Sequence, residues 1–232
     1  MEIIAEIGQN HNGNMSVARR LIAEAKECGA DVAKFQLYDA KALFPKEGNL
    51  WFEYNCQTEL SRADVDTLAA ECDRIGIEFM ASVFDTERIA WLEAVGVKRH
   101  KIASRSIKDP ALVEGVAATG KPLLVSLGMW DGKGVPKIKT PGKVEFLYCV
   151  SKYPTELSDL HFGDVDFSRY GGFSDHTIGI DAAVIAMSRG AKIIEKHFTM
   201  DKALYGPDHS GSMTPSELAE LSRFRNSLSI AM

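Results

Sequence analysis

Three titratable side chains follow two isoleucines in the segment AKIIEKHF, residues 191–198. Paired isoleucines are typical of a buried β-strand, whereas an uncompensated charge in a core is costly. Because side chains alternate between the two faces of a strand, Glu195 and His197 point to one face and Lys196 to the other. The segment therefore predicts a core strand that ends in groups able to carry out chemistry.

A second strand pattern, FSDHT at residues 173–177, ends in the same way. Ser174 and His176 share one of its faces, and Asp175 lies on the other. Two imidazoles at neighbouring strand ends can hold a divalent metal and leave positions open for water or substrate, which suits a Lewis acid. A single histidine is more often a hydrogen-bonded packing residue, but the pair of His176 and His197 favours metal ligands.

Two lysines lie inside apolar strand patterns, Lys34 in DVAKFQ and Lys101 in HKIAS. An isolated amine in a core is costly, so each is expected to face a polar cavity. There the lysines would bind a carboxylate or a phosphate together with nearby hydroxyl groups. These hydroxyl groups belong to Ser104, Ser126, Ser151 and Ser174. Two alternatives stay open: one lysine extends outward between helices, or one forms a Schiff base.

Strand and helix patterns alternate along the chain and must position these groups. Strands are predicted at residues 2–7, 31–37, 77–83, 97–103, 121–127, 144–150, 170–175 and 191–198. Helices are predicted at residues 16–29, 61–75, 109–119, 178–189 and 214–228. Crossover helices make neighbouring strands parallel, and eight parallel strands close into a (β/α)8 TIM barrel, an α/β fold. An open doubly wound sheet is the competing fold, but no GxGxxG turn supports it.

Closure of a barrel makes its first and last strands neighbours, which brings Glu6 close to His197. The segments 128–143 and 151–169 are rich in Gly, Pro and charge, so one or two outer helices are expected to be short or missing.

Two further histidines have two interpretations each. His209 in YGPDHSGS is either a loop residue or a member of the site. His11 in GQNHNGN either lines the first loop or caps the following helix.

Composition limits the classes of function. The chain has 232 residues, a net charge of −5 and 45% hydrophobic residues, which predicts one soluble domain over residues 1–232. The acidic balance argues against a nucleic-acid surface. The start MEIIAEIG does not read as a signal peptide and no apolar run is long enough for a membrane span, so a cytoplasmic location is expected. Four scattered cysteines predict free thiols in a reducing compartment.

Several motifs together resemble one known family. AEIGQNHNG, ADVAKFQ, HKIAS, GKPLLVSLGM, YCVSKYPTE, FSDHTIGI, IIEKHFTMD and YGPDHS occur in the order found in sialic acid synthases, from about residue 3 to residue 228. The chain thus looks like the catalytic barrel of that phosphoenolpyruvate-dependent family. The resemblance implies condensation of phosphoenolpyruvate with the open-chain aldehyde of an N-acyl amino sugar, typically N-acetylmannosamine. The products would be a nine-carbon 2-keto acid and phosphate.

The resemblance also implies roles for individual residues. His176 and His197 would hold Mn²⁺ or Mg²⁺, and Glu6 and Glu195 would act near the reacting centre in proton transfer or water positioning. The positions that match phosphoenolpyruvate-binding residues are Lys34, Lys101, Ser104, Ser126, Ser151 and Ser174. The positions that match sugar-side residues are Gln36, Asn55, Tyr153 and Asp208.

Three departures from the family pattern bear on the substrate and on assembly. The usual KIGSGE reads KIASRS here, so Ser106 replaces a sugar-contacting carboxylate and Arg105 is added, which favours an acidic or strongly oxygenated group. The usual STxF reads ASVF, which places Ser82 at a substrate-binding position. The antifreeze-like domain that usually follows the barrel is expected to be absent, so a homodimer is possible but not implied.

Two other functions stay open at this point. One is a metal-dependent aldolase or a different 2-keto-acid synthase that uses the same strand ends. The other is a degenerate barrel that binds a sugar or an anion as a sensor or regulatory partner. Release of phosphate from phosphoenolpyruvate separates the first alternative from a sialic acid synthase, and a sensor need not turn over at all.

Overall fold

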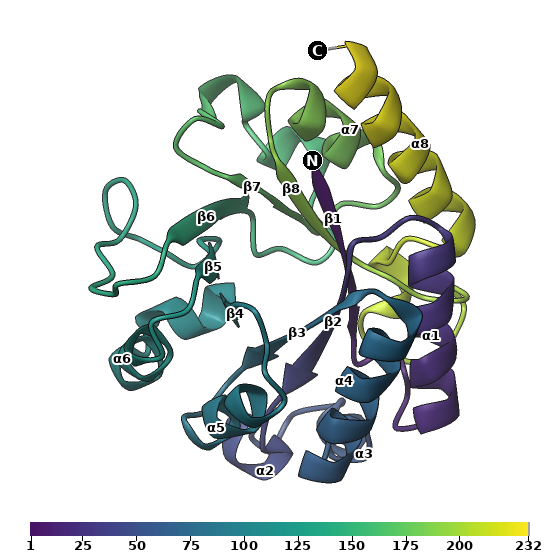
Figure 1. Ribbon diagram of the computed structural model, residues 1–232, viewed down its shortest axis with the longest axis vertical. Coiled ribbons are helices and arrows are strands. Elements are labelled where there is room, and N and C mark those ends of the chain that lie inside the picture. Colours follow the sequence, from purple (N-terminus) through teal and green to yellow (C-terminus); the bar gives the residue numbers. More distant parts are fainter. Residues whose placement is uncertain (232) are drawn as a thin grey trace.

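Eight parallel strands pair in sequence order and β8 returns to pair with β1, so the sheet of the computed structural model is a closed barrel (Figure 1). The structure describes residues 1–231. The strands are β1 (Glu2–Gly8), β2 (Val32–Leu37), β3 (Glu78–Val83), β4 (His100–Ile102), β5 (Leu123–Ser126), β6 (Val144–Cys149), β7 (Gly172–Asp175) and β8 (Ile193–His197). The predicted (β/α)8 TIM barrel is confirmed, with strands shorter than predicted at β4, β5 and β7.

The helices surround the barrel (Figure 1). They are α1 (Met15–Glu27), α2 (Ala40–Leu43), α3 (Phe52–Thr58), α4 (Arg62–Ile75), α5 (Glu87–Ala94), α6 (Pro110–Ala118), α7 (Asp181–Ser188) and α8 (Pro215–Ala231). Helix α4 has the signals that sequence reading relies on, because Ser61 and Asp64 form a capping box and Gly76 ends the helix at φ 76°. Helices α2, α3 and α5 were not predicted. Helix α2 has only four residues, and the N-cap residues of α3 and α5, Trp51 and Thr86, make no side-chain capping bond.

The expected gap in the helical layer is confirmed. Residues 127–143 between β5 and β6 are all described, and they contain no helix. The connection from β6 to β7 contains only two short 3₁₀ helices, η2 (Leu157–Asp159) and η3 (Phe162–Asp164). Proline and glycine interrupt helical hydrogen bonding in the first of these connections, and the side chains of β6 are correspondingly less buried than those of β8.

The interior of the barrel changes character along its axis. At the amino ends of the strands, the guanidinium of Arg99 pairs with Glu2 at 2.6 Å and with Glu78 at 2.8 Å. The next layer is a buried apolar cluster of Ile4, Val32, Met80, Leu124, Leu147 and Ile193. Because alternate residues of each strand face inward, the layer after this one is formed by residues two positions further on, and most of them are polar. The fold therefore places a layer of polar side chains directly above the apolar layer.

One buried ion pair lies on the opposite faces of these strands. Lys196 Nζ is 3.0 Å from Asp175 Oδ2 and donates to the carbonyl oxygen of Thr177 at 2.6 Å, and both charged side chains are fully buried. The pairing agrees with the predicted alternation, which places Lys196 and Asp175 on the strand face opposite to Glu195 and His176. Both residues also border the cavity at the strand ends.

No helix within residues 1–231 is long and apolar enough to cross a membrane. All four cysteines are free, as predicted.

The buried pair generates a stability prediction. Asp175→Ala leaves the ammonium of Lys196 in the core without its partner, which is expected to lower the free energy of unfolding by about 3–5 kcal/mol. Urea denaturation measures this loss. Asp131→Ala removes the partner of Lys108 from a largely exposed pair at 2.7 Å and is expected to leave the urea midpoint unchanged. Equal effects of the two substitutions would contradict the assignment.

Candidate active site

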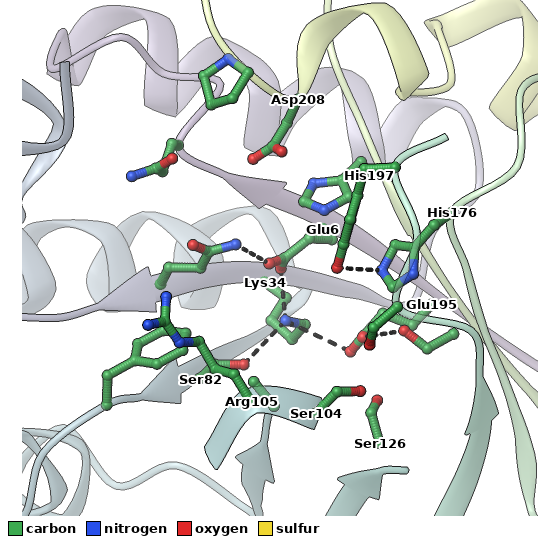
Figure 2. A pocket seen from close by; sticks show the side chains of 18 of the residues that line it. Glu6, Lys34, Ser82, Ser104, Arg105, Ser126, His176, Glu195, His197 and Asp208 are labelled. Carbon is green, nitrogen blue, oxygen red and sulfur yellow. Dashed lines mark hydrogen bonds and ion pairs between the residues drawn. The ribbon is translucent and has the colours of Figure 1, made fainter. Parts of the chain in front are cut away.

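A cavity of about 640 Å³ opens at the carboxyl ends of the strands. All the predicted site residues line it, and Figure 2 shows many of them converging on one space. They are Glu6, Lys34, Gln36, Asn55, Ser82, Lys101, Ser104, Ser126, Ser151, Tyr153, Ser174, His176, Glu195, His197 and Asp208. The upper end of a TIM barrel is where the loops and strand ends supply catalytic groups. The structure thus brings the predicted residues together, while their roles stay predictions.

Lys34 is at the centre of a buried network of charges on the cavity floor (Figure 2). Its ammonium is 2.7 Å from Glu6 Oε2 and 3.5 Å from Glu195 Oε2, and it donates a hydrogen bond to Ser82 Oγ at 3.2 Å. Gln36 donates to Glu6 Oε1 at 2.9 Å. The lysine faces the cavity rather than the helices, so the alternative of an outward-pointing Lys34 is wrong.

Lys101 occupies the opposite side of the same network. Its ammonium donates to Ser126 Oγ at 2.7 Å and lies 3.5 Å from Glu195 Oε1. Ser174 donates to the same carboxylate oxygen at 2.9 Å. Ser126 and Glu195 line the cavity, so these contacts show that Lys101 also faces inward. Glu195 therefore links the two amines.

The network sets the charge state of its members. Burial acts to raise the pKa of Glu195, but the charges of Lys101 and Lys34 and the Ser174 hydrogen bond lower it to about 2. Burial acts to lower the pKa of Lys34, and the adjacent Glu195 and Glu6 outweigh it and raise that pKa. Burial lowers the pKa of Lys101, which has only Glu195 nearby as a close counter-charge. Among residues 1–231, Oε2 of each carboxylate contacts only the ammonium of Lys34, at 2.7 Å for Glu6 and 3.5 Å for Glu195.

Hydroxyl groups extend the floor on the side of β4 to β6. Ser104 Oγ accepts a hydrogen bond from the Gly128 N–H at 3.1 Å. A Cβ atom at Gly128 would lie 2.8 Å from Cys149 Sγ and would collide with Ser151 Oγ, so only glycine allows these side chains to pack so closely. The hydroxyl of Ser151 is buried, lines the cavity and has no hydrogen-bond partner among the described residues. A buried, unpaired hydroxyl at a cavity wall suits a bound anion.

The two predicted metal ligands lie side by side at the cavity edge. The ring centroids of His176 and His197 are 6.0 Å apart. His176 Nδ1 is 3.0 Å from the carbonyl oxygen of Val150, an acceptor, so that nitrogen carries the proton and Nε2 presents its lone pair. Tyr153 Oη lies 3.1 Å from this Nε2. Neither ring nitrogen of His197 has a hydrogen-bond partner within residues 1–231, and its Nδ1 is buried.

The other two histidines considered in the sequence analysis, His209 and His11, do not line the cavity. His209 is buried, with Nδ1 2.7 Å from Thr199 Oγ1 and Nε2 3.0 Å from Asn12 Oδ1. His11 accepts a hydrogen bond from the Gly13 N–H at 3.2 Å. Burial lowers the pKa of His11 to about 4. Both are packing residues that stabilise loops.

The outer part of the cavity contains a group of residues that sequence reasoning missed. They are Gln9, Phe44, Asn49, Trp51, Phe84, Met129 and Pro207. Gln9 donates to Asn55 Oδ1 at 2.9 Å and so fixes the amide of a predicted sugar-side residue. Phe44 and Phe84 lie just beyond α2 and β3. An aromatic residue directly after the end of a helix or strand was the available signal, but the same pattern is typical of core packing.

Comparison with known proteins agrees with this geometry. The model of the NeuB family matches residues 21–232. The chain belongs to the NeuB family. The prediction of an enzyme of the sialic acid synthase type is thereby confirmed at the level of the family.

Individual relatives and a solved structure are similar over nearly all of the chain. The N,N'-diacetyllegionaminic acid synthase of Legionella pneumophila is 37% identical, covering 94% of this chain and 69% of that protein. The human N-acetylneuraminate-9-phosphate synthase is 36% identical, covering 95% and 68%. The crystal structure of the sialic acid synthetase of Leptospira borgpetersenii with citrate is 31% identical with a TM-score of 0.86, covering 97% of this chain and 84% of that one.

The lowered pKa of Glu195 generates a pH prediction. Its stabilising effect is complete above the ordinary carboxyl pKa of 4.5 and is lost as the pH falls towards about 2. Glu195→Gln mimics the protonated side chain, so the variant is expected to be less stable by on the order of 3 kcal/mol at pH 7, with the difference shrinking below pH 4.5. Urea denaturation from pH 7 to pH 3 measures it. A difference that stays constant over this range, or an equal effect of exposed Glu53→Gln, contradicts the prediction.

Proposed function

We propose that this chain condenses phosphoenolpyruvate with the open-chain aldehyde of an N-acyl amino sugar. The products are a nine-carbon 2-keto acid, when the sugar is a hexosamine, and inorganic phosphate. The observation that carries the proposal is the single cavity in which two buried lysines, two carboxylates and a histidine pair face one another. Membership of the NeuB family supports the same reaction class.

The floor of the cavity is suited to a small molecule with two anionic groups. Lys34 and Lys101 supply the charge, and serine hydroxyls supply hydrogen bonds. Phosphoenolpyruvate carries a carboxylate and a phosphate on adjacent positions of one short skeleton. We therefore assign it to the floor, where the unpartnered hydroxyl of Ser151 gains an acceptor. The serines that contribute are Ser82, Ser104, Ser126, Ser151 and Ser174.

The histidine pair fits a divalent metal, Mn²⁺ or Mg²⁺. The Val150 carbonyl fixes the protonated nitrogen of His176, and the ring of His197 lacks a protein partner within residues 1–231. No group of three or more His, Cys, Asp or Glu side chains in that range is arranged to hold an ion, so two imidazoles would be the protein ligands. When bound, such an ion supplies a Lewis acid for the aldehyde oxygen.

The two carboxylates are placed to move protons. The bond-forming step joins C3 of the enolpyruvyl group to the aldehyde carbon and leaves positive charge at C2. The electron pair of the aldehyde C=O bond moves to the aldehyde oxygen, which takes up a proton, and the carboxylates of Glu6 and Glu195 stabilise the positive charge at C2. A water molecule then adds to C2 and gives one proton to Glu6 or Glu195. Loss of the remaining hydroxyl proton forms the C2 ketone as the C2–O bond to phosphate breaks and phosphate leaves.

The acceptor occupies the outer half of the cavity. Its polar wall is formed by Gln36, Asn55, Tyr153 and Asp208. Tyr153 is 63% exposed, so its ring is available to cover a sugar. Asp208 lies on the far side of Glu6 and His197 from the floor in Figure 2. These groups offer hydrogen bonds to hydroxyl and amide groups of an acylated amino sugar.

A turnover assay tests the reaction. Purified protein with phosphoenolpyruvate, Mn²⁺ and a panel of N-acylated hexosamines is expected to release phosphate and to form a product whose mass equals the two substrates plus water minus phosphoric acid. Pyruvate in place of phosphoenolpyruvate gives no product if the proposal is right. Turnover with pyruvate would identify an aldolase, and binding without turnover would identify a sensor.

The histidine pair is tested separately. His176→Ala is expected to abolish turnover and to weaken binding of Mn²⁺ at least tenfold, because the ion loses one of two protein ligands. Calorimetric titration with Mn²⁺ measures the second effect without any reaction. His161→Ala, outside the cavity lining, is the matched control. Unchanged Mn²⁺ binding by the His176→Ala variant would contradict the assignment of His176 as a metal ligand.

Lys101 is expected to act on one substrate only. Lys101→Ala removes a buried charge from the floor and is expected to raise the KM for phosphoenolpyruvate roughly 10- to 100-fold, with a much smaller effect on the KM for the sugar. Steady-state kinetics with each substrate varied in turn measures this. Lys192→Ala, on an exposed residue before β8, is the control and should change neither constant. Equal increases in both KM values contradict the role.

A further inference from the structure

One permanent cation that lines the cavity has no counter-ion among the described residues. Arg105 lies in the 3₁₀ helix η1 (Ser104–Lys108), directly after β4, and lines the cavity. Among residues 1–231, no carboxylate is within ion-pair distance of its guanidinium, whereas other arginines, such as Arg88 and Arg99, pair with two carboxylates each. The cation is therefore available to a ligand.

Aromatic rings hold Arg105 at the cavity edge. Its guanidinium carbon is 5.4 Å from the ring centroid of Phe44 and 6.0 Å from that of Phe84. Contact with ring faces orients the guanidinium and leaves its N–H edge free for hydrogen bonds. Figure 2 shows Arg105 on the same side of the cavity as Ser82, away from Asp208 and the histidines.

The order of strands around the barrel determines which part of the acceptor lies near Arg105. β4 and β8 are four strands apart in either direction around the barrel, so Arg105 after β4 and His197 at the end of β8 stand on opposite sides of the cavity. In the proposed reaction, the aldehyde carbon C1 of the acceptor is at the histidines. An open-chain hexosamine is linear, with C6 at the other end, so C6 extends across the cavity towards Arg105.

We propose that Arg105 determines acceptor specificity by binding an anionic group at the C6 end of the sugar. A phosphate monoester and a carboxylate share the chemistry that a guanidinium recognises, two oxygens able to accept parallel hydrogen bonds. The inference rests on the proposed function and adds a substrate class to it, an acylated hexosamine with a negative charge at C6. The amines of Lys34 and Lys101 are engaged with carboxylates, so Arg105 alone supplies an unpaired permanent cation to the acceptor half.

Three acceptors that differ only at C6 test this assignment. They are N-acetylmannosamine, its 6-phosphate and the corresponding C6 carboxylic acid, each assayed for phosphate release from phosphoenolpyruvate. Wild-type protein is expected to show a kcat/KM at least tenfold higher for one or both anionic acceptors. The arm with the greater gain identifies phosphate or carboxylate as the group that is bound.

Variants at residue 105 assign the effect to the side chain. Arg105→Ala is expected to lower kcat/KM for the preferred anionic acceptor roughly 10- to 100-fold, while the neutral acceptor changes less than about threefold. Arg105→Lys keeps the charge but lacks the planar fork, so it should restore only part of the preference. Lys108→Ala, in the same 3₁₀ helix but outside this cavity, should leave the preference intact.

The outcomes separate the two claims. Turnover of all three acceptors at equal efficiency overturns the role of Arg105 and leaves the proposed function in place. An increase in the KM for phosphoenolpyruvate with the neutral acceptor in Arg105→Ala also overturns it, because the guanidinium would then bind the other substrate. Absence of phosphate release with every acceptor overturns the proposed function and the inference with it.

Discussion

The structure depends on one constraint, the cost of keeping charge inside a barrel. Lys34 and Lys101 lie where an apolar layer would stabilise the fold more, and they are tolerated because Glu6 and Glu195 lie beside them. Glu195 in turn stays ionised because the two amines are close.

Closure of the barrel converts distant sequence segments into one site. Glu6 pairs in register with His197 across the β1–β8 seam, and Lys34 is the partner of Glu6 across β1 and β2. Beneath them the apolar layer excludes water, which strengthens the interactions above it. The arrangement explains why the reactive groups appear at the ends of apolar runs in the sequence.

Residues whose burial conflicts with their chemistry were predictable, and residues that behave as ordinary packing groups were not. Lys34 and Lys101 stand out inside strand patterns, and the alternation around Glu195 fixes which neighbours face the cavity. Phe44 and Phe84 gave no such signal, because an aromatic residue after a helix or strand is just as common in a buried core. Helix α5 was missed because it is short and its N-cap Thr86 makes no side-chain bond. The ion pair of Arg99 with Glu2 and Glu78 joins three strands and has no local pattern.

The sealed lower end of the barrel has a consequence for the order of events. Arg99, its two carboxylates and the six apolar side chains above them fill the lower part of the barrel axis, as side chains usually do in TIM barrels. Ligands of the cavity therefore enter from the carboxyl ends of the strands. Under the proposed function, phosphoenolpyruvate lies on the floor and the sugar lies above it, so phosphoenolpyruvate has to bind before the sugar.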